Sequence, residues 1–231
     1  MLEALRAEVY EANLELVRRR LVLYTFGNAS GVSREQGLLV IKPSGVPYET
    51  MSPAHMVITD LDGHIVEGSL RPSSDLATHA ALYRAFPSIG GIAHTHSRHA
   101  TAWAQAGREI LCFGTTHADY FHGPIPVTEP LTPPEIETDY EANTGVAIVR
   151  LMAGRDPLAC PAVLVSGHAP FCWGKSVTDA AHAAVIVEEL AAIAFQTLII
   201  NPDAKPISSV LHDKHHHRKH GPEAYYGQRK A

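Results

Sequence analysis

The chain has 231 residues, 45% of them hydrophobic and 19% charged, which is typical of a folded globular protein and argues against disorder. A formal net charge of −5 argues against the broad positive surface that nucleic-acid-binding proteins use. The longest uncharged apolar run, residues 190–200, is too short to cross a bilayer, so we expect neither nucleic acid nor membrane as a partner. The 15 histidines are anomalous, because histidine is a common metal ligand and general base.

The three cysteines are widely spaced, odd in number and outside any CxxC pair: Cys112, Cys160 and Cys172. This pattern indicates reduced thiols in a cytoplasmic protein rather than a disulfide framework or a thiolate zinc site. Charged residues are spread through residues 1–21, so no signal sequence is visible. Since no repeat, linker or composition break interrupts the chain, we expect one domain over residues 1–231.

The first third of the chain predicts one helix and a series of short strands. Apolar residues at helical spacing predict an amphipathic helix over residues 1–20. An Asp-Leu-Asp-Gly turn at residues 60–63 predicts a β-hairpin. The expected strands are residues 21–33, interrupted by a Gly-Asn-Ala-Ser loop, then 38–41, 56–59 and 64–67.

Helices and strands alternate through the rest of the chain. Capping and breaking residues predict helices at 73–86 (with Ser73 and Ser74 as N-cap residues), 97–106, 133–152 (broken near 143–145), 176–200 and, weakly, 207–219. Short apolar runs predict strands at 89–96, 110–113 and 162–165, the last with a hairpin partner at 171–173. The several hairpin signals favour an α/β fold with a mostly antiparallel central sheet flanked by helices.

Two histidines end one predicted strand and a third follows another. His94 and His96 are two residues apart, so their imidazoles project to one face of the strand. His168 could supply a third ligand and Asp75 a carboxylate, with His79 as a competitor. Three imidazoles with a carboxylate or water suit Zn²⁺, and Mn²⁺ or Co²⁺ could substitute. On spacing alone, a hydrogen-bonded polar pair at a strand end explains the two histidines equally well.

Two small polar turns and one helix start have the composition of anion-binding sites. Residues 27–30 (Gly-Asn-Ala-Ser) and 42–45 (Lys-Pro-Ser-Gly) each offer backbone N–H groups and a hydroxyl. The Ser73-Ser74 pair stands at a predicted helix N-terminus, where free N–H groups favour a phosphate. Ordinary turns and an ordinary N-cap remain the alternative for each, since none is a Walker A or GxGxxG pattern.

Three polar features lie in the second half of the chain. Asp119 follows a predicted strand and is a candidate acid or base, although a lone loop aspartate is usually solvated or capping. Tyr225 and Tyr226 stand in a polar tail, where they could pack on a neighbouring surface. The histidine-rich run 214–220 could bind a metal or nucleic acid, but a solvated helix face is the simpler interpretation on an acidic protein.

Seven motifs occur in one order along the chain: GNAS, VIKPSGV, PSSDLATH, FPSIGGIAHTHSRHATAWAQAG, GTTHADYFHG, HAPFCWG and AYYGQ. From about residue 1 to residue 228 they resemble the L-ribulose-5-phosphate 4-epimerase branch of the class II aldolase/epimerase superfamily. The resemblance implies a single α/β domain, a central antiparallel sheet with helices on both sides, and a homotetramer with active sites at subunit interfaces. His216 and His217 depart from it, since they thicken the basic tail.

The resemblance also implies roles for individual residues. The metal positions match Asp75, His94, His96 and His168. The acid/base positions match Asp119 and Tyr226, with the tyrosine supplied by an adjacent subunit. The positions that bind substrate and phosphate, or lie near the site, match Gly27, Asn28, Lys42, Ser44, Gly45, Ser73, Ser74, Thr115, Glu141 and His215.

The implied reaction inverts C4 of a pentulose 5-phosphate. The C4 hydrogen is not alpha to the C2 ketone, so simple deprotonation cannot invert that carbon, whereas cleavage and re-formation of the C3–C4 bond can. Two alternatives stay open: an aldolase acting on a sugar phosphate, and a metal-free binding module on the same fold. Asp75 and the AYYGQ tail favour the epimerase over the aldolase, and the presence of all three histidines argues against the metal-free module.

Overall fold

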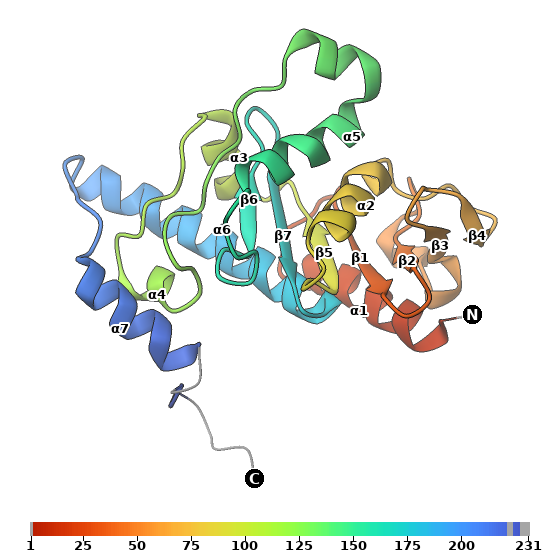
Figure 1. Ribbon diagram of the computed structural model, residues 1–231, viewed down its shortest axis with the longest axis horizontal. Coiled ribbons are helices and arrows are strands. Elements are labelled where there is room, and N and C mark those ends of the chain that lie inside the picture. The colour runs from red at the N-terminus through yellow and green to blue at the C-terminus, as the bar shows by residue number, and fades with distance from the viewer. Residues whose placement is uncertain (1, 221–223, 227–231) are drawn as a thin grey trace.

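Seven strands form one central sheet in which every neighbouring pair is antiparallel (Figure 1). This computed structural model describes residues 2–220 and 224–226, and the count of seven strands refers to these residues. In spatial order they are β4 (Ile65–Glu67), β3 (Val57–Asp60), β2 (Leu38–Ile41), β1 (Asn28–Ser33), β5 (Gly91–His94), β7 (Pro170–Gly174) and β6 (Ala162–Leu164). The expected antiparallel sheet and its hairpin signals are confirmed.

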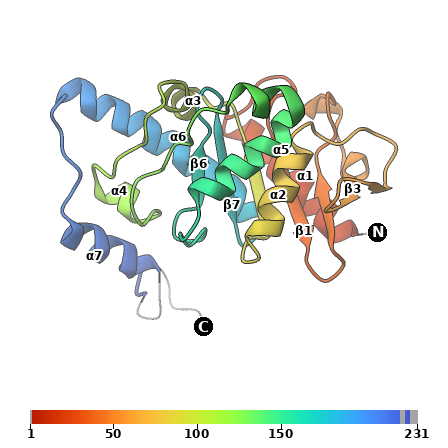
Figure 2. The ribbon, with the colours of Figure 1, turned by 45° about the horizontal axis from the view of Figure 1, so that its top comes forward.

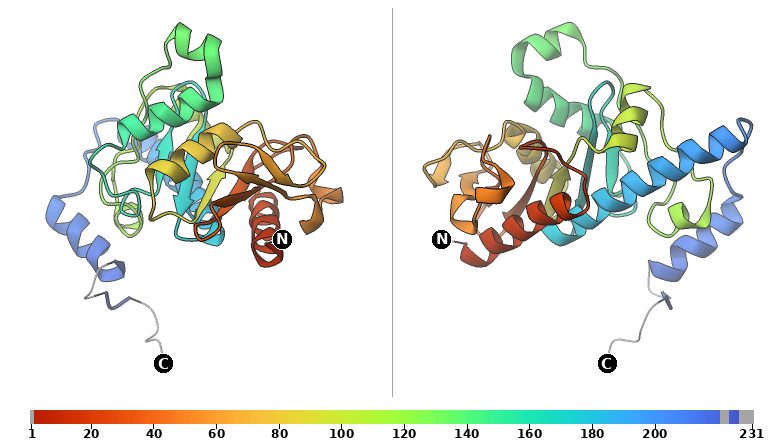
Figure 3. Two further views of the ribbon diagram at one scale, coloured as in Figure 1. Left: turned by 45° about the vertical axis from the view of Figure 1, so that its right-hand side comes forward. Right: turned by 180° about the vertical axis from the view of Figure 1, so that it is seen from behind.

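Helices cover both faces of the sheet, as expected. α1 and α6 cross one face and pack on β1, β5 and β7, whereas α2 and α5 pack together on the other face (Figures 2 and 3). The helices are α1 (Glu3–Arg18), α2 (Leu76–Ala85), α3 (Arg98–Gln105), α4 (Thr115–Ala118), α5 (Pro133–Leu151), α6 (Val177–Ile200) and α7 (Ser209–Lys219), with short 3₁₀ turns η1 (Tyr48–Thr50) and η2 (Pro53–His55). The core lies between the helices and the sheet, and Trp173 and Tyr83 are among its largest fully buried side chains.

α6 begins and ends where the sequence predicts. Ser176 Oγ accepts a hydrogen bond from the Asp179 backbone N–H at 3.1 Å, and the helix stops at Asn201 before a proline. By length and composition α6 could cross a membrane, but one face of it, from Val177 to Ala194, is buried against β5 and β7. Its last turns expose apolar side chains, with Ile199 and Ile200 at 63% and 84% of their surface. α6 is therefore a core helix with an uncovered apolar end.

Two predicted strands are wrong. Residues 21–23 are partly buried, but they form the turn that ends α1 and not a strand. Arg20 has a positive φ of 58°, and the Leu21 N–H donates to the Leu16 carbonyl. The Gly-Asn-Ala-Ser segment is not a loop beyond Gly27, because Asn28 already starts β1. Residues 110–113 form only an isolated bridge, between Ile110 and Ile125.

The break in α5 lies at Asp139 and not at residues 143–145. Asp139 has non-helical angles (φ −149°, ψ 83°), and its carboxylate accepts from the Ala142 N–H at 3.3 Å, which restarts the helix. Gly145 has a packing role instead. A Cβ built there would meet the Ala81 Cβ at 2.7 Å and the Thr78 backbone at 3.3 Å, so this glycine lets α5 approach α2 closely.

The N-cap of α2 is Asp75, not Ser73 or Ser74 as the sequence predicts. Ser73 has other partners as well: its N–H donates to the Lys42 carbonyl at 2.9 Å, and its hydroxyl accepts from Asn28 Nδ2 at 3.0 Å and from the Asp75 N–H at 3.4 Å. Cross-sheet contacts therefore decide what Ser73 does, and they tie the start of α2 to the end of β2.

Candidate active site

Three imidazoles converge at one end of the sheet. His94 is the last residue of β5, His96 follows two residues later, and His168 lies in the turn between β6 and β7. The Nε2 atoms of His94 and His96 are 3.1 Å apart, and those of His168 and His96 are 3.3 Å apart. A ring nitrogen of each lies within 4.8 Å of the other two. The strand-end pair thus reaches one point, in keeping with its spacing, and His168, which the sequence offers as a possible third ligand, meets the pair there.

The far side of two of these rings is held by protein groups. His94 Nδ1 lies 2.9 Å from the Pro170 carbonyl oxygen, which can only accept, so Nδ1 carries the proton and Nε2 a lone pair. The same ring stacks on Phe171, with centroids 4.1 Å apart. The Tyr140 hydroxyl lies 3.1 Å from His168 Nδ1. Outer contacts of this kind orient metal-binding histidines.

The charge state of the cluster favours a cation. Burial, together with the neighbouring imidazoles of His94 and His96, lowers the pKa of His168 to about 4. Burial likewise lowers the pKa of His96. These two rings are therefore neutral at neutral pH, and a set of neutral imidazoles whose nitrogens face one another fits a divalent transition metal.

Asp75 lies beside the cluster, but no oxygen of it belongs to the group of ring nitrogens within 4.8 Å. Its Oδ2 accepts a hydrogen bond from Asn28 Nδ2 at 2.6 Å. Burial opposes ionisation of Asp75, but the nearby imidazoles of His94 and His79, with the Asn28 hydrogen bond, outweigh burial and lower the pKa. Asp75 is thus a buried carboxylate next to three histidines, and its role as a direct ligand stays a prediction.

His79, the competing ligand, is fully buried and turned toward the sheet. Its Nδ1 contacts Ser30 Oγ at 2.7 Å, and the structure does not place it in the histidine group. Burial lowers its pKa to about 3. His79 is therefore a neutral core residue beneath the cluster.

The predicted anion-binding turns meet next to the histidines. The sheet register places Asn28 opposite His94, and the Ser44 N–H donates to the Arg71 carbonyl at 2.9 Å, which joins the 42–45 turn to the segment before α2. Gly27 and Gly45 both have positive φ, 71° and 68°. A Cβ on Gly27 would lie 2.9 Å from the His94 carbonyl oxygen, so the close approach of this turn to the cluster requires glycine.

Lys42 is the cation of these turns. Its Nζ donates to the Thr25 carbonyl at 3.2 Å and lies 4.8 Å from the centroid of the Tyr48 ring. Burial lowers the pKa of Lys42 to about 8, and the nearby charge of Asp75 opposes that shift. Ser73 and Ser74 adjoin it at the start of α2, so the turns bring one ammonium, hydroxyls and backbone N–H groups together.

A second group of predicted residues gathers around α4 and α7. Asp119 follows α4, and its carboxylate contacts His215 Nδ1 at 3.0 Å, Arg218 Nε at 2.9 Å and Lys219 Nζ at 3.4 Å. Burial opposes ionisation of Asp119, but the hydrogen bonds from Arg218 and His215 outweigh it and lower the pKa. The Tyr226 ring lies 4.9 Å from the Arg218 guanidinium and 4.5 Å from Lys219 Nζ. Within one chain, Arg218 and Lys219 thus contact both the Asp119 carboxylate and the Tyr226 ring.

The two groups lie in different parts of the fold. α4 and α7 pack together at one end of the molecule (Figures 1 and 2). Strands β6 and β7 separate these two helices from β5, the strand that ends in His94. Thr115 starts α4 and belongs to this end, whereas the Glu141 carbonyl accepts a hydrogen bond from Thr78 on α2. Within one chain, the histidines and turns form one group, and the predicted acid/base residues form another.

Two features of the site are not predicted from the sequence. Tyr140 contacts His168, but it stands mid-helix in α5 with no local signal. The run 214–220 is not simply a solvated face: Arg218 and Lys219 hold Asp119, and His216 is only 8% exposed. Helical spacing in the run 214–220 could have indicated that one side of this helix is buried and that its cations contact an acidic residue.

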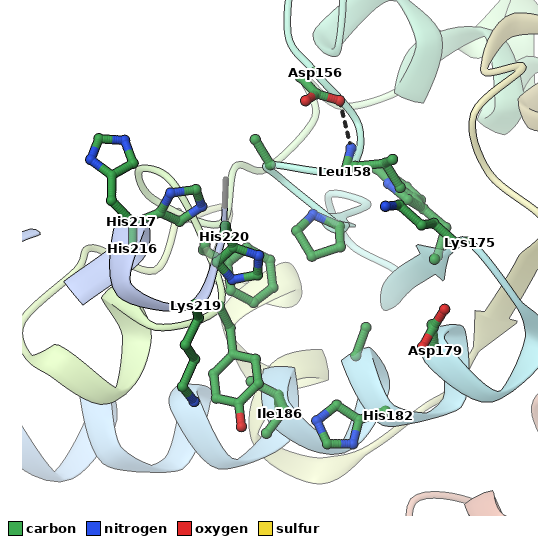
Figure 4. A pocket seen from close by; sticks show the side chains of 17 residues that line it. Asp156, Leu158, Lys175, Asp179, His182, Ile186, His216, His217, Lys219 and His220 are labelled. Atoms are coloured by element: carbon green, nitrogen blue, oxygen red, sulfur yellow. Dashed lines mark hydrogen bonds between the residues drawn. The ribbon is translucent and has the colours of Figure 1, made fainter. Parts of the chain in front are cut away.

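A cavity of about 640 Å³ lies away from the histidine cluster, between α6, α7 and the loop before β6 (Figure 4). Neither the three convergent histidines nor the 27–30 and 42–45 turns border it, so we place the candidate active site at the histidines rather than in this cavity. The side chains labelled on its wall are Asp156, Leu158, Lys175, Asp179, His182, Ile186, His216, His217, Lys219 and His220.

An antiparallel sheet between two helical layers, with three histidines converging at one end, defines a known class of protein. Residues 7–195 match the family described as "Class II Aldolase and Adducin N-terminal domain", and the chain belongs to that family. It is 53% identical over 228 residues to the L-ribulose-5-phosphate 4-epimerase UlaF of Salmonella paratyphi C (strain RKS4594), with 99% of this chain and 100% of the relative covered.

Solved structures of the same family share the fold. An L-fuculose 1-phosphate aldolase superposes with a TM-score of 0.79 at 24% identity, covering 93% of this chain and 95% of its own. YgbL from Klebsiella pneumoniae, described as a putative aldolase/epimerase/decarboxylase, superposes with a TM-score of 0.72 at 24% identity, covering 93% and 99%. At this identity the likeness establishes the class II aldolase fold and not the reaction.

Proposed function

We propose that this chain is an L-ribulose-5-phosphate 4-epimerase, which interconverts L-ribulose 5-phosphate and D-xylulose 5-phosphate. The observation that carries the proposal is the convergence of three histidines, two of them held on their far side by protein groups, beside the anion-binding turns in a chain similar to an epimerase over its whole length. That similarity includes α7 and the described part of the tail, which lie beyond the residues matched by the family as a whole.

We propose His94, His96 and His168 as the ligands of a divalent cation, most suitably Zn²⁺, with Mn²⁺ or Co²⁺ able to substitute. The convergent nitrogens support this donor set. A cation bound there supplies a Lewis acid that stabilises the enediolate produced by C3–C4 cleavage. Asp75, fixed by Asn28, completes the donor set or balances the charge next to it.

The anion-binding turns hold the 5-phosphate in this proposal. The Lys42 ammonium and the N–H groups and hydroxyls of residues 27–28, 44–45 and 73–74 suit a phosphate dianion. The phosphate is remote from the carbon that inverts. Binding it keeps the aldehyde fragment in place while the C3–C4 bond is broken, and so favours re-addition over escape.

Asp119 and Tyr226 act as the acid/base pair in this proposal. The 4-hydroxyl points in opposite directions in the two epimers, so one group removes its proton on one side and another returns a proton on the other side. The lowered pKa of Asp119 suits a carboxylate that starts the cycle ionised. His215 and Arg218 orient it, and Thr115 and Glu141 complete the surroundings of the substrate.

We further propose a homotetramer in the cytoplasm, with each active site built from two subunits. Within one chain, α4 and α7 lie apart from the strand ends that carry the histidines, so Asp119 and Tyr226 of one subunit serve the histidines of the next. The exposed apolar end of α6 supports an extensive contact between copies. Three unpaired, buried cysteines support a reducing compartment.

Proton NMR with L-ribulose 5-phosphate deuterated at C4 tests this function. Metal-loaded protein should form D-xylulose 5-phosphate with the C4 label retained, because only the C3–C4 bond breaks. Release of a free aldehyde without epimerisation would indicate the aldolase alternative instead. Washout of the label into solvent would contradict cleavage and show proton abstraction at C4.

A further inference from the structure

A second histidine cluster lies outside the candidate active site, where α7 meets the loop after α4. His122 belongs to that loop, and His216 and His217 belong to α7. A ring nitrogen of each lies within 4.8 Å of the other two. The ring centroids of His122 and His216 are 4.8 Å apart, and those of His216 and His217 are 5.7 Å apart. Figure 4 shows His216 and His217 together on one wall of the large cavity.

A carboxylate braces one of these rings. His122 Nε2 lies 3.1 Å from Asp213 Oδ1. A neutral imidazole that donates this hydrogen bond keeps its lone pair on Nδ1. The carboxylate–histidine pair is the outer arrangement that orients histidine ligands of metals. His122 is thus set up as an acceptor for a cation.

The second ring has an unsatisfied nitrogen. His216 is 8% exposed, and its Nδ1 is buried with no hydrogen-bond partner among the described residues. A buried polar atom without a partner costs about 1–3 kcal/mol. A cation would give this nitrogen the partner it lacks.

Two further histidines nearby are already committed to the backbone. His212 Nε2 lies 3.0 Å from the Phe121 carbonyl and 3.1 Å from the Gly123 N–H. His220 Nε2 lies 2.9 Å from the Asp119 carbonyl. These contacts occupy one nitrogen of each ring, and His212 also groups with His122 and Asp213. The buried, unpartnered Nδ1 of His216 favours His122, His216 and His217 over that alternative group.

We propose that His122, His216 and His217 bind a second divalent transition metal ion, separate from the candidate active site, with Asp213 orienting His122. Three imidazoles suit Zn²⁺, Co²⁺ or Ni²⁺, and the fourth position takes water. The ion joins α7 to the loop after α4. The bound ion therefore stabilises the position of α7, the helix whose His215, Arg218 and Lys219 contact Asp119.

Titration of untagged, metal-free protein with Co²⁺ tests the proposal, because tetrahedral Co²⁺ absorbs visible light and its binding needs no activity assay. His96→Asn removes a ligand of the candidate active site. In that background we expect about one Co²⁺ per chain with visible absorption. Adding His122→Ala or His217→Ala should weaken this binding at least about 10-fold, within the effect expected for losing part of a ligand shell.

The variants are chosen so that folding stays intact. His122 and His217 are exposed, and His64→Ala, at another exposed histidine paired with an aspartate, is the matched control and should leave Co²⁺ binding unchanged. If the His96→Asn background fails to fold, the stoichiometry of the parent protein replaces it: two ions per chain, falling to one in His217→Ala. One ion per chain in both the parent protein and the His217→Ala variant would overturn the proposal. So would loss of the site in His212→Ala but not in His217→Ala.

Discussion

At the scale of single residues, what a side chain can bind is decided by the contacts on its other side. The Nδ1–H of His94 donates a hydrogen bond to the Pro170 carbonyl oxygen, so the lone pair of Nε2 faces the cluster. Asp75 is kept ionised by Asn28 and the nearby imidazoles despite its burial. Lys42 is the opposite case, since burial makes its charge less stable and brings the pKa to about 8. Each shift follows from a named neighbour or from burial.

The pKa of Lys42 predicts the alkaline limb of the pH profile. Below about pH 8 the ammonium is charged and can bind a phosphate dianion, and above it the amine is neutral, so kcat/KM should fall as pH rises past about 8. Lys42→Met should raise KM about 10- to 100-fold, the effect of losing a hydrogen bond to a charged group, and should remove this limb. Steady-state kinetics between pH 6 and about 9.5 measure both. Lys175→Met, at a lysine of the separate cavity, is the control, and an unchanged limb in Lys42→Met would contradict the assignment.

At the scale of elements, close packing of helices sets the geometry on the face opposite α1 and α6. α5 bends at Asp139, where its carboxylate caps the second segment, and Gly145 then brings that segment against α2. α2 starts at Asp75, and α5 carries Tyr140, the partner of His168. The contact between these two helices therefore supports the histidine cluster from behind.

Gly145→Ala should destabilise the protein by overpacking this contact. The new methyl group would lie 2.7 Å from Ala81, whereas a Cβ on Gly114 meets nothing within 4 Å. We expect a loss of about 1–3 kcal/mol in the free energy of unfolding, from the urea midpoint, and little change for Gly114→Ala. Equal midpoints for the two variants would show that α2 can move aside at no cost.

At the scale of the whole molecule, the function proposed above builds each active site from two chains. The histidines and anion-binding turns lie at one place, and Asp119 and Tyr226 lie with α7 at another. The family match ends at residue 195, so α4 and Asp119 lie inside the matched part of the chain, whereas α7 and Tyr226 lie beyond it.

Mixed tetramers test this arrangement. His96→Asn and Tyr226→Phe should each be nearly inactive alone, since one lacks a metal ligand and the other an acid/base group. If a site takes its metal from one chain and its tyrosine from the next, tetramers that contain both variants should regain part of the activity. Mixing through co-expression with two different affinity tags, followed by the NMR assay, measures the recovery. No recovery in verified mixed tetramers would mean that each site is built from one chain.

Local signals in the sequence predict much of the fold. Periodicity and capping residues place α1, α3, α6 and the two hairpins within a few residues, because those elements are decided by interactions between near neighbours. The predictions fail where a distant contact competes. Ser73 is drawn away from the helix cap by Asn28 and Lys42, and the apolar run at 110–113 is buried without a strand to pair with along its length.

The sequence by itself determined the antiparallel sheet, the pairing of His94 with His96 and the candidate residues of the turns, since strand alternation and turn chemistry act over a few residues. Only the tertiary structure decided that His168 meets that pair, that Tyr140 braces it, and that Arg218 and Lys219 hold Asp119. The same is true of the second cluster, in which His122 meets α7 across more than 90 residues of chain. Such contacts depend on how whole elements pack, and no local spacing encodes that packing.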